Sequence, residues 1–302
     1  MKKGLFVFLL MFCCSLSAMA KVYNSGDLSS CDDKMCEQSG NLANGILKEY
    51  YENGKLFIEA SYKNGMLEGI EKVYDENGNL LSEQPWKNGA REGIAKRYYE
   101  NGNLLEEATW KNGKIEGIKK WYYENGNLFG EVPYKNGKAD GVDKEYYKNG
   151  KLRREELYKN GVLEGISKWY YENGNLEFEA SYKNGMTEGI VKWYYENGNL
   201  LSEAPYKNGM SEGIAKGYYE NGNLWTETLY KNDKKDGISK AYYENGKLKS
   251  EAIFKEGEAI SGFIYNEETG EKREMSEKDL DFLMGRFRIT GPSVKGKTRN
   301  FF

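Results

Sequence analysis

The chain has 302 residues with 44 basic and 47 acidic side chains, a net charge of −3, and no histidine. A chain of this acidity has no electrostatic basis for binding nucleic acid, and the lack of histidine removes the commonest general base and metal ligand. We therefore expect no nucleic-acid partner, no metal site and no cofactor.

Residues 1–20 have the layout of a secretory signal peptide. Lys2 and Lys3 supply a positive start, an apolar run extends from Leu5 to Cys14, and Ser17 to Ala20 ends the segment with small residues. We therefore predict that the protein is exported from a bacterial cell, to the periplasm, the envelope or the extracellular space.

Two membrane-anchored alternatives stay open at this end of the chain. The apolar run is short for a bilayer-spanning helix, which disfavours an uncleaved anchor. A lipid attached at Cys13 or Cys14 is the second alternative, although Phe12 stands where such a site has a small residue.

Residues 21–44 are predicted to form an N-terminal cap. A repeat array needs one because its terminal sheet edge is otherwise open to pairing. Cys31 and Cys36 lie in this segment and are a disulfide candidate in an oxidising compartment. A pair of free thiols is the alternative.

Residues 45–262 consist of nine near-identical units of 24 residues, which indicates a repeat architecture. The unit reads Tyr-Tyr-Glu-Asn-Gly-Asn-Leu-x-x-Glu-x-x-Tyr-Lys-Asn-Gly-x-x-Glu-Gly-Ile-x-Lys-x. Its two Asn-Gly pairs are strong hairpin signals, and the runs between them are rich in Tyr, Trp, Ile and Leu. We therefore predict an all-β fold, an elongated single-layer antiparallel β-meander of nine hairpin repeats with two strands per unit.

The first turn of each unit predicts a strand register. If Asn53 and Gly54 form a two-residue loop, Tyr51 lies opposite Leu56, and a lysine faces a glutamate in every unit. These pairs form a structural ladder, whose main effect is to penalise register slips. The ladder residues are Lys48, Glu59, Lys72, Glu83, Lys96, Glu107, Lys120, Glu131, Lys144, Glu155, Lys168, Glu179, Lys192, Glu203, Lys216, Glu227, Lys240 and Glu251.

The second turn extends the ladder to the next unit. When Glu59 also faces Lys72, Tyr62 lies opposite Gly69, and an aromatic side chain covers the backbone of a cross-strand glycine. Three prolines share one position that this register puts in a hydrogen-bonded pair, so we expect frayed or bulged pairing there. They are Pro85, Pro133 and Pro205.

Residues 263–302 are predicted to hold a C-terminal cap, a short helix and a basic tail. A final altered hairpin covers 262–273, and Ser276 is expected to be the N-cap of a helix that ends near Met284. Residues 286–302 contain basic and no acidic side chains. A disordered tail and weak contact with an anionic membrane are the two interpretations.

The unit resembles the bacterial variant of the MORN repeat. Both Tyr-Tyr-Glu-Asn-Gly-Asn-Leu and Tyr-Lys-Asn-Gly-x-x-Glu-Gly are similar to it in kind. Proteins of this sort are often labelled antitoxins of the YwqK-type family, and some carry a phosphatidylinositol phosphate kinase label. The resemblance implies an elongated hairpin sheet that contacts other molecules, and it does not identify the partner.

A kinase activity does not fit these residues. Phosphoryl transfer needs a nucleotide cradle, metal-binding carboxylates and a positioned base. The glycines lie in turns rather than in a phosphate loop that opens a helix, and the repeated lysines and glutamates have a simpler use in the ladder. We therefore expect no enzyme activity and assign no catalytic residue.

The expected function is a non-enzymatic exported scaffold that binds a protein or glycan. The alternatives are an antitoxin that neutralises a cognate toxin and a peripheral lipid binder that uses the basic tail. Tryptophans at variable positions are the candidate binding surface, with cross-strand packing as the other interpretation. They are Trp121, Trp169, Trp193 and Trp225.

Overall fold

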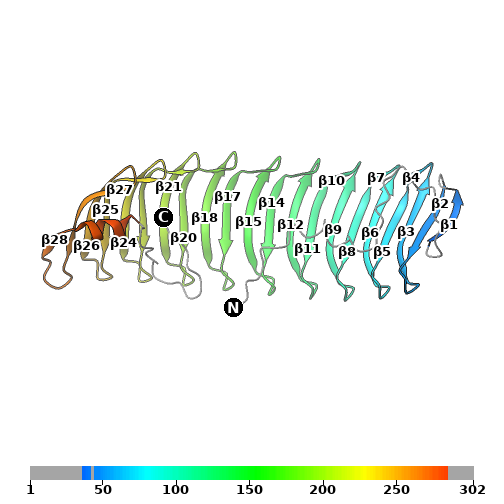
Figure 1. Cartoon of the computed structure of the whole chain (residues 1–302), viewed down its shortest axis with the longest axis horizontal. Coiled ribbons are helices and arrows are strands. Elements are labelled where there is room, and N and C mark those ends of the chain that lie inside the picture. The colour runs from blue at the N-terminus through cyan, green and yellow to red at the C-terminus, as the bar shows by residue number, and fades with distance from the viewer. Residues whose placement is uncertain (1–35, 42–43, 285–302) are drawn as a thin grey trace.

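The computed structural model describes residues 36–41 and 44–284, and these form one long antiparallel sheet with a short helix at its C-terminal end (Figure 1). Each strand pairs with strands close to it in the sequence, so the sheet is a meander. The predicted fold class is confirmed. The signal peptide, Cys31 and the basic tail lie outside the described residues, so the predictions made for them stay predictions.

Each unit begins with an eight-residue strand that runs from a leucine to a lysine. Its alternating side chains and β-branched or aromatic residues suit a strand with two distinct faces. These strands are β3 (Leu56–Lys63), β6 (Leu80–Lys87), β9 (Leu104–Lys111), β12 (Leu128–Lys135), β15 (Leu152–Lys159), β18 (Leu176–Lys183), β21 (Leu200–Lys207), β24 (Leu224–Lys231) and β26 (Leu248–Lys255).

The return strand is divided into two pieces in most units. One residue near its start, Glu68 in the first unit, lies outside both pieces. The two-residue pieces are β4 (Met66–Leu67), β7 (Ala90–Arg91), β10 (Lys114–Ile115), β13 (Lys138–Ala139), β16 (Val162–Leu163), β19 (Met186–Thr187) and β22 (Met210–Ser211). The six-residue pieces are β5 (Gly69–Tyr74), β8 (Gly93–Tyr98), β11 (Gly117–Tyr122), β14 (Gly141–Tyr146), β17 (Gly165–Tyr170), β20 (Gly189–Tyr194) and β23 (Gly213–Tyr218).

The two ends of the array differ from its middle. β1 (Cys36–Asn41) pairs with β2 (Asn44–Tyr50) at the N-terminal end. β25 (Lys234–Tyr242) is unbroken, and β27 (Glu258–Tyr265) pairs with β28 (Lys272–Glu274). Helix α1 (Glu277–Leu283) has Ser276 as its N-cap, with the side chain of Asp279 completing a capping box. No described helix has the length and apolar character needed to cross a bilayer.

The first turn is longer than the sequence predicts. The N–H of Tyr51 donates to the carbonyl oxygen of Lys55 at 2.8 Å, so the loop has three residues, and only Gly54 has a positive φ, +81°. Tyr51 therefore faces Lys55, and the prediction that it faces Leu56 is wrong. A bulge at Phe57 absorbs the extra residue.

This bulge is the reason the ladder register survives. Lys48 lies opposite Glu59 on one side of β3, and Glu59 lies opposite Lys72 on the other. The same pairing recurs in later units, as in Lys168 opposite Glu179. The longer loop shifts the strand pairing by one residue, and the bulge shifts it back by one. Beyond the bulge, the residues therefore pair as they would after a two-residue loop.

The second turn has two residues, Asn64 at φ +50° and Gly65 at φ +74°, as a type I′ turn requires. It sets Tyr62 opposite Leu67, not opposite Gly69 as predicted. The pairing of Glu59 with Lys72 requires a different register from the one that the turn sets. A bulge at Gly69, which has a φ of +91°, lies between the two registers and connects them. Tyr62 still faces a glycine on its other side, Gly45.

The three shared prolines face this second bulge. The carbonyl oxygen of Pro133 accepts from the N–H of Asp140 at 2.9 Å. The N–H and carbonyl of a strand residue point to the same side, so the bulged strand lies where proline has no N–H to donate. A Cβ placed on Gly141 would lie 2.8 Å from Pro133 Cγ. The expectation of bulged pairing at these prolines is confirmed, and the bulge recurs in units that have no proline.

Candidate functional site

Alternation along the strands divides the side chains between two faces of the sheet. We call one the ladder face; in the first unit it carries Glu59, Ser61, Ile70, Lys72 and Tyr74. We call the other the varied face, because its residue type changes from unit to unit. In the first unit the varied face carries Ile58, Ala60, Tyr62, Glu71 and Val73.

On the ladder face, lysine and glutamate lie opposite each other but rarely form ion pairs. Among the described residues the distances within 4.0 Å are those of Lys48–Glu59, Lys72–Glu83 and Lys240–Glu227, at 3.5, 3.9 and 3.6 Å. Exposed pairs of this kind contribute little to stability. The ladder acts mainly through its register.

The ladder glutamates accept hydrogen bonds from tyrosine hydroxyls instead. Tyr170 donates to Glu155 Oε1 at 2.9 Å, and Tyr98 donates to Glu83 Oε2 at 3.0 Å. Burial, then the hydrogen bond to Glu155, raises the pKa of Tyr170 to about 12. The second tyrosine of each pair links neighbouring units, as Tyr147 does by donating to the carbonyl oxygen of Tyr170 at 2.6 Å. The repeated residues are therefore used by the fold.

All six tryptophans of the chain lie on the varied face. They include the four predicted from the sequence and two that the sequence reasoning did not single out. The overlooked pair is Trp86 and Trp110, between whose rings Arg91 lies, 5.6 and 4.7 Å from the two centroids. The strand register could have found them, because it assigns both to the face of Trp121.

The structure brings Trp169 and Trp193 together around Phe178. The ring centroid of Phe178 lies 4.9 Å from that of Trp169 and 4.4 Å from that of Trp193, and the two indoles meet edge to face at 6.1 Å. Small residues such as Ala180 are fully buried beneath this aromatic cluster. The two predicted tryptophans are thus held rigidly next to each other.

The other two predicted tryptophans lie apart from this cluster. The indole nitrogen of Trp121 donates to Glu106 at 3.1 Å, and Lys119 lies 4.8 Å from its ring centroid. Trp225 lies at a bulge, with its ring centroid 6.5 Å from that of Tyr219. The four residues therefore belong to one face and to three separate neighbourhoods.

A charged cluster borders the aromatic cluster. The Arg154 guanidinium lies 3.3 Å from Asp143, 2.7 Å from Glu145 and 3.2 Å from Glu156. Trp169 donates its indole N–H to Glu156 at 3.2 Å, which joins the two clusters. Burial raises the pKa of Asp143 to about 6, against the opposing effect of Arg154. No sequence signal marked these residues, because this combination of side chains occurs only once along the array.

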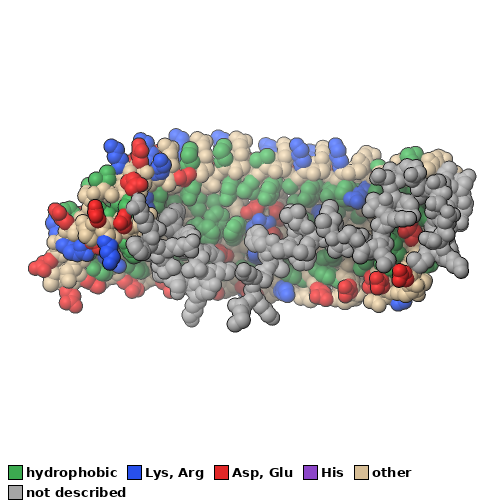
Figure 2. All heavy atoms as spheres, in the orientation of Figure 1, with side chains coloured by type: hydrophobic (Ala, Val, Ile, Leu, Met, Phe, Trp, Pro, Cys, Tyr) green, Lys and Arg blue, Asp and Glu red, His purple; other side chains and the backbone are tan. Residues whose placement is uncertain are grey.

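The two long rims of the sheet differ in the charged side chains that they expose. Figure 2 shows apolar side chains in a hollow that runs lengthwise between a rim with blue side chains and a rim with red ones. The first rim carries an exposed lysine beside each second turn, such as Lys63 and Lys87. The second carries an exposed glutamate in most first turns, such as Glu52 and Glu100.

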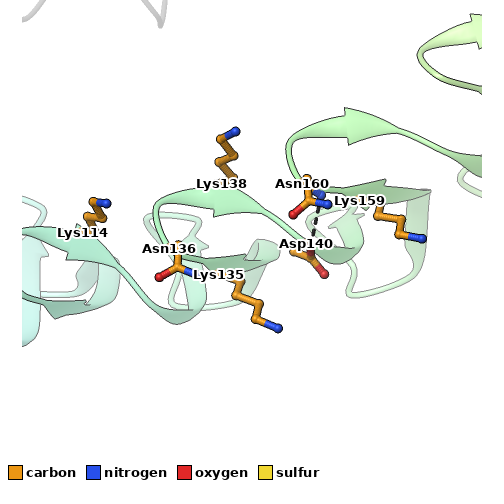
Figure 3. Close-up of a pocket in the computed structure, with 7 residues that line it drawn as sticks. All are labelled: Lys114, Lys135, Asn136, Lys138, Asp140, Lys159 and Asn160. Atoms are coloured by element: carbon orange, nitrogen blue, oxygen red, sulfur yellow. Dashed lines mark hydrogen bonds between the residues drawn. The ribbon is translucent and has the colours of Figure 1, made fainter.

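A shallow hollow of about 560 Å³ lies between neighbouring turns on the lysine rim. Its lining residues are Lys114, Lys135, Asn136, Lys138, Asp140, Lys159 and Asn160. Asp140 accepts from the backbone N–H of Asn160 at 3.1 Å, and the lysine side chains extend in separate directions (Figure 3). The lysines therefore do not converge on a ligand. The described residues contain no group of side chains that could hold a metal ion.

The sequence matches the model of the MORN repeat variant nine times. The matched segments are 43–64, 67–88, 91–112, 115–136, 139–160, 163–184, 187–208, 211–232 and 235–256. No similar protein is found among the curated sequences.

The solved structures that match this chain do so with low identities and low TM-scores. The TcdB2-TccC3-Cdc42 complex is 14% identical over 74% of this chain, with a TM-score of 0.18. This chain spans only 14% of that one. A porin-like protein from Bacteroides uniformis is 8% identical, with 76% of this chain and 92% of that chain covered and a TM-score of 0.17. Neither likeness carries a functional conclusion.

Proposed function

Because the chain belongs to the MORN repeat variant family, we propose that it is a non-enzymatic, exported scaffold that binds a protein or glycan partner through its varied face. One observation carries the proposal: all six tryptophans lie on that face. The residues that repeat have structural uses on the ladder face and in the turns. The residues free to specify a partner are those that change between units.

The chemistry of the varied face supports a binding role. Tryptophan, tyrosine and arginine dominate the energetics of protein interfaces, because they bury large areas and still offer polar atoms. Trp169, Trp193 and Arg154 are held by neighbours, so little side-chain entropy is lost when a partner covers them. The hollow between the rims offers a long surface to an extended partner (Figure 2).

Capture from an envelope extract by residues 21–302 tests this proposal. The double variant W169A/W193A is expected to lose the captured partner. The control is I166A/I190A, which changes the same two strands on the opposite face. If both variants retain the partner and W169A/W193A only unfolds at lower temperature, the tryptophans serve packing and the proposal is wrong.

Two further experiments separate the alternatives. Rescue of cells from the toxic product of a neighbouring gene, on co-expression with this chain, would assign the antitoxin role. Loss of binding to anionic vesicles on removal of 286–302 would assign the lipid-surface role. The scaffold proposal expects neither result.

A further inference from the structure

The ladder face carries a row of exposed isoleucines along the length of the sheet, which we call the isoleucine stripe. Six of its members keep 49 to 58% of their surface exposed. They are Ile70, Ile94, Ile118, Ile166, Ile190 and Ile214. Apolar residues lie opposite four of the six, as Pro133 does opposite Ile118, whereas polar Thr109 and Ser181 lie opposite Ile94 and Ile166.

The stripe and the ladder beside it form a surface large enough for a stable interface. At about 4.8 Å per strand, eighteen strand positions extend over roughly 85 Å, and two ladder-face residues along a strand span about 13 Å. The stripe and the adjacent charged ladder together therefore cover on the order of 1,000 Å², of which the apolar stripe makes up about half. A stable interface buries roughly 800 Å² per partner, so the two rows together are large enough to form one.

Its regular spacing indicates which partner fits. The isoleucines recur every 24 residues, as do the ladder charges beside them. A second copy of this chain has the same period, so it can meet every isoleucine and every ladder charge in register. The ladder also alternates lysine and glutamate from strand to strand, as in Lys72 followed by Glu83, so it can complement itself.

We propose that two copies of this chain pack ladder face to ladder face, antiparallel, with their isoleucine stripes in contact. A two-fold axis parallel to the strands keeps stripe over stripe and ladder over ladder. When the axis passes between neighbouring strands, each lysine of one copy faces a glutamate of the other. The result is a closed, isologous dimer of two sheets about 10 Å apart.

This arrangement suits the shape of the sheet. Over most of its length the strands keep nearly the same direction (Figure 1), and sheets that stay flat over many strands are typically stabilised by stacking or by side-chain ladders. The varied face points away from the interface. Both copies therefore keep the tryptophans available, and the dimer is independent of the proposed function.

Sedimentation of residues 21–302 measures the association directly. The wild-type chain is expected to have the mass of two chains at about 10 µM, and I118R/I166R/I214R is expected to weaken dimerisation at least a hundredfold. The matched control M66R/M186R/M210R changes residues of similar exposure, 40 to 46%, in the short strands that follow the second turns, and should remain a dimer. If the arginine variant fails to fold, threonine at the same positions replaces it.

A wild-type monomer at about 100 µM would overturn the proposal, as would equal effects of the two variants. Binding of monomers to vesicles, lost on changing the stripe, would assign the surface to lipid and also overturn it. Lysine cross-linking between isotopically light and heavy copies tests orientation. The antiparallel dimer predicts links between Lys72 and the far end of the partner, around Lys216. Links between Lys72 and Lys72 of the two copies contradict it.

Discussion

The two faces of the sheet are built on the same strands and are filled by different rules. On the ladder face, glutamate, lysine, tyrosine and isoleucine recur in nearly every unit. On the varied face, the position of Arg154 is held by phenylalanine in the next unit and by serine in the one after. Repetition therefore marks what the fold and the proposed dimer use, and the proposed partner surface lies where the residues vary.

Burial separates the faces as well. The residues packed most closely lie on the varied face, where Ala180 and Ala204 are 0% exposed, whereas Ile190 on the ladder face is 53% exposed. The varied face therefore supplies most of the packing within one chain. Changes there should therefore cost more stability than changes to the ladder face.

The largest effect is expected at Arg154 on the varied face. Replacing it with alanine leaves three clustered carboxylates without their guanidinium, which should cost about 3–5 kcal/mol of the free energy of unfolding. Urea denaturation measures the loss. Arg153→Ala is the control, because that side chain is 50% exposed and pairs only at the edge of the cluster. Equal losses in the two variants would contradict the account.

The second bulge should be the next most sensitive feature. Gly141→Ala adds a Cβ against Pro133 to a backbone with φ +134°, so we expect a loss of about 3 kcal/mol. Gly189→Ala meets no atom within 4 Å and carries only the strain of φ +92°, about 1 kcal/mol. Thermal unfolding of both variants tests the difference. A smaller loss at Gly141 would refute the bulge geometry.

Asp143 gives the varied face a pH dependence. Its pKa is raised from 3.8 to about 6, so the folded chain binds this proton more tightly than the unfolded chain does. This contribution to stability is full below about pH 4 and is lost as the pH rises through about 6. Asp143→Asn should therefore stabilise the protein by about 2 kcal/mol near pH 7 and flatten the curve between pH 4 and 6. A variant that is less stable near pH 7 would show that the pairing with Arg154 dominates.

The smallest effects are expected on the ladder face. Tyr170→Phe removes the hydrogen bond to Glu155 and should cost about 1 kcal/mol. Lys168→Gln removes a partly exposed charge opposite Glu179 and should cost less than about 0.5 kcal/mol. Denaturation of the two variants side by side decides whether tyrosine or lysine is the more important partner of the ladder glutamates. A larger loss for the lysine variant would reverse the assignment.

The sequence predicts the period, the meander and most of the ladder register, because Asn-Gly turns and strict repetition restrict the chain strongly. It does not predict the three-residue loop at Gly54, since an Asn-Gly pair suits both loop lengths. The compensating bulge at Phe57 is seen only in the three-dimensional structure. The tyrosine–glutamate bonds were missed because a register gives the strand neighbours and not the reach of their side chains.

The candidate site is less predictable than the fold. The register assigns every tryptophan to a face, so Trp86 could have been included by counting along the strand. The contact between Trp169 and Trp193 depends on side-chain rotamers. The Arg154 cluster depends on four residues that occur together once, and no periodic pattern reveals such a combination.

The most direct test of the central claim is to footprint the captured partner on the chain with hydroxyl radicals. If the varied face is the binding surface, the partner should protect Trp121, Trp169 and Trp193 from oxidation. Tyr170 and Ile166, on the opposite face of β17, should react as they do in the unbound protein. Protection of the ladder-face residues with unchanged oxidation of the tryptophans would contradict the assignment.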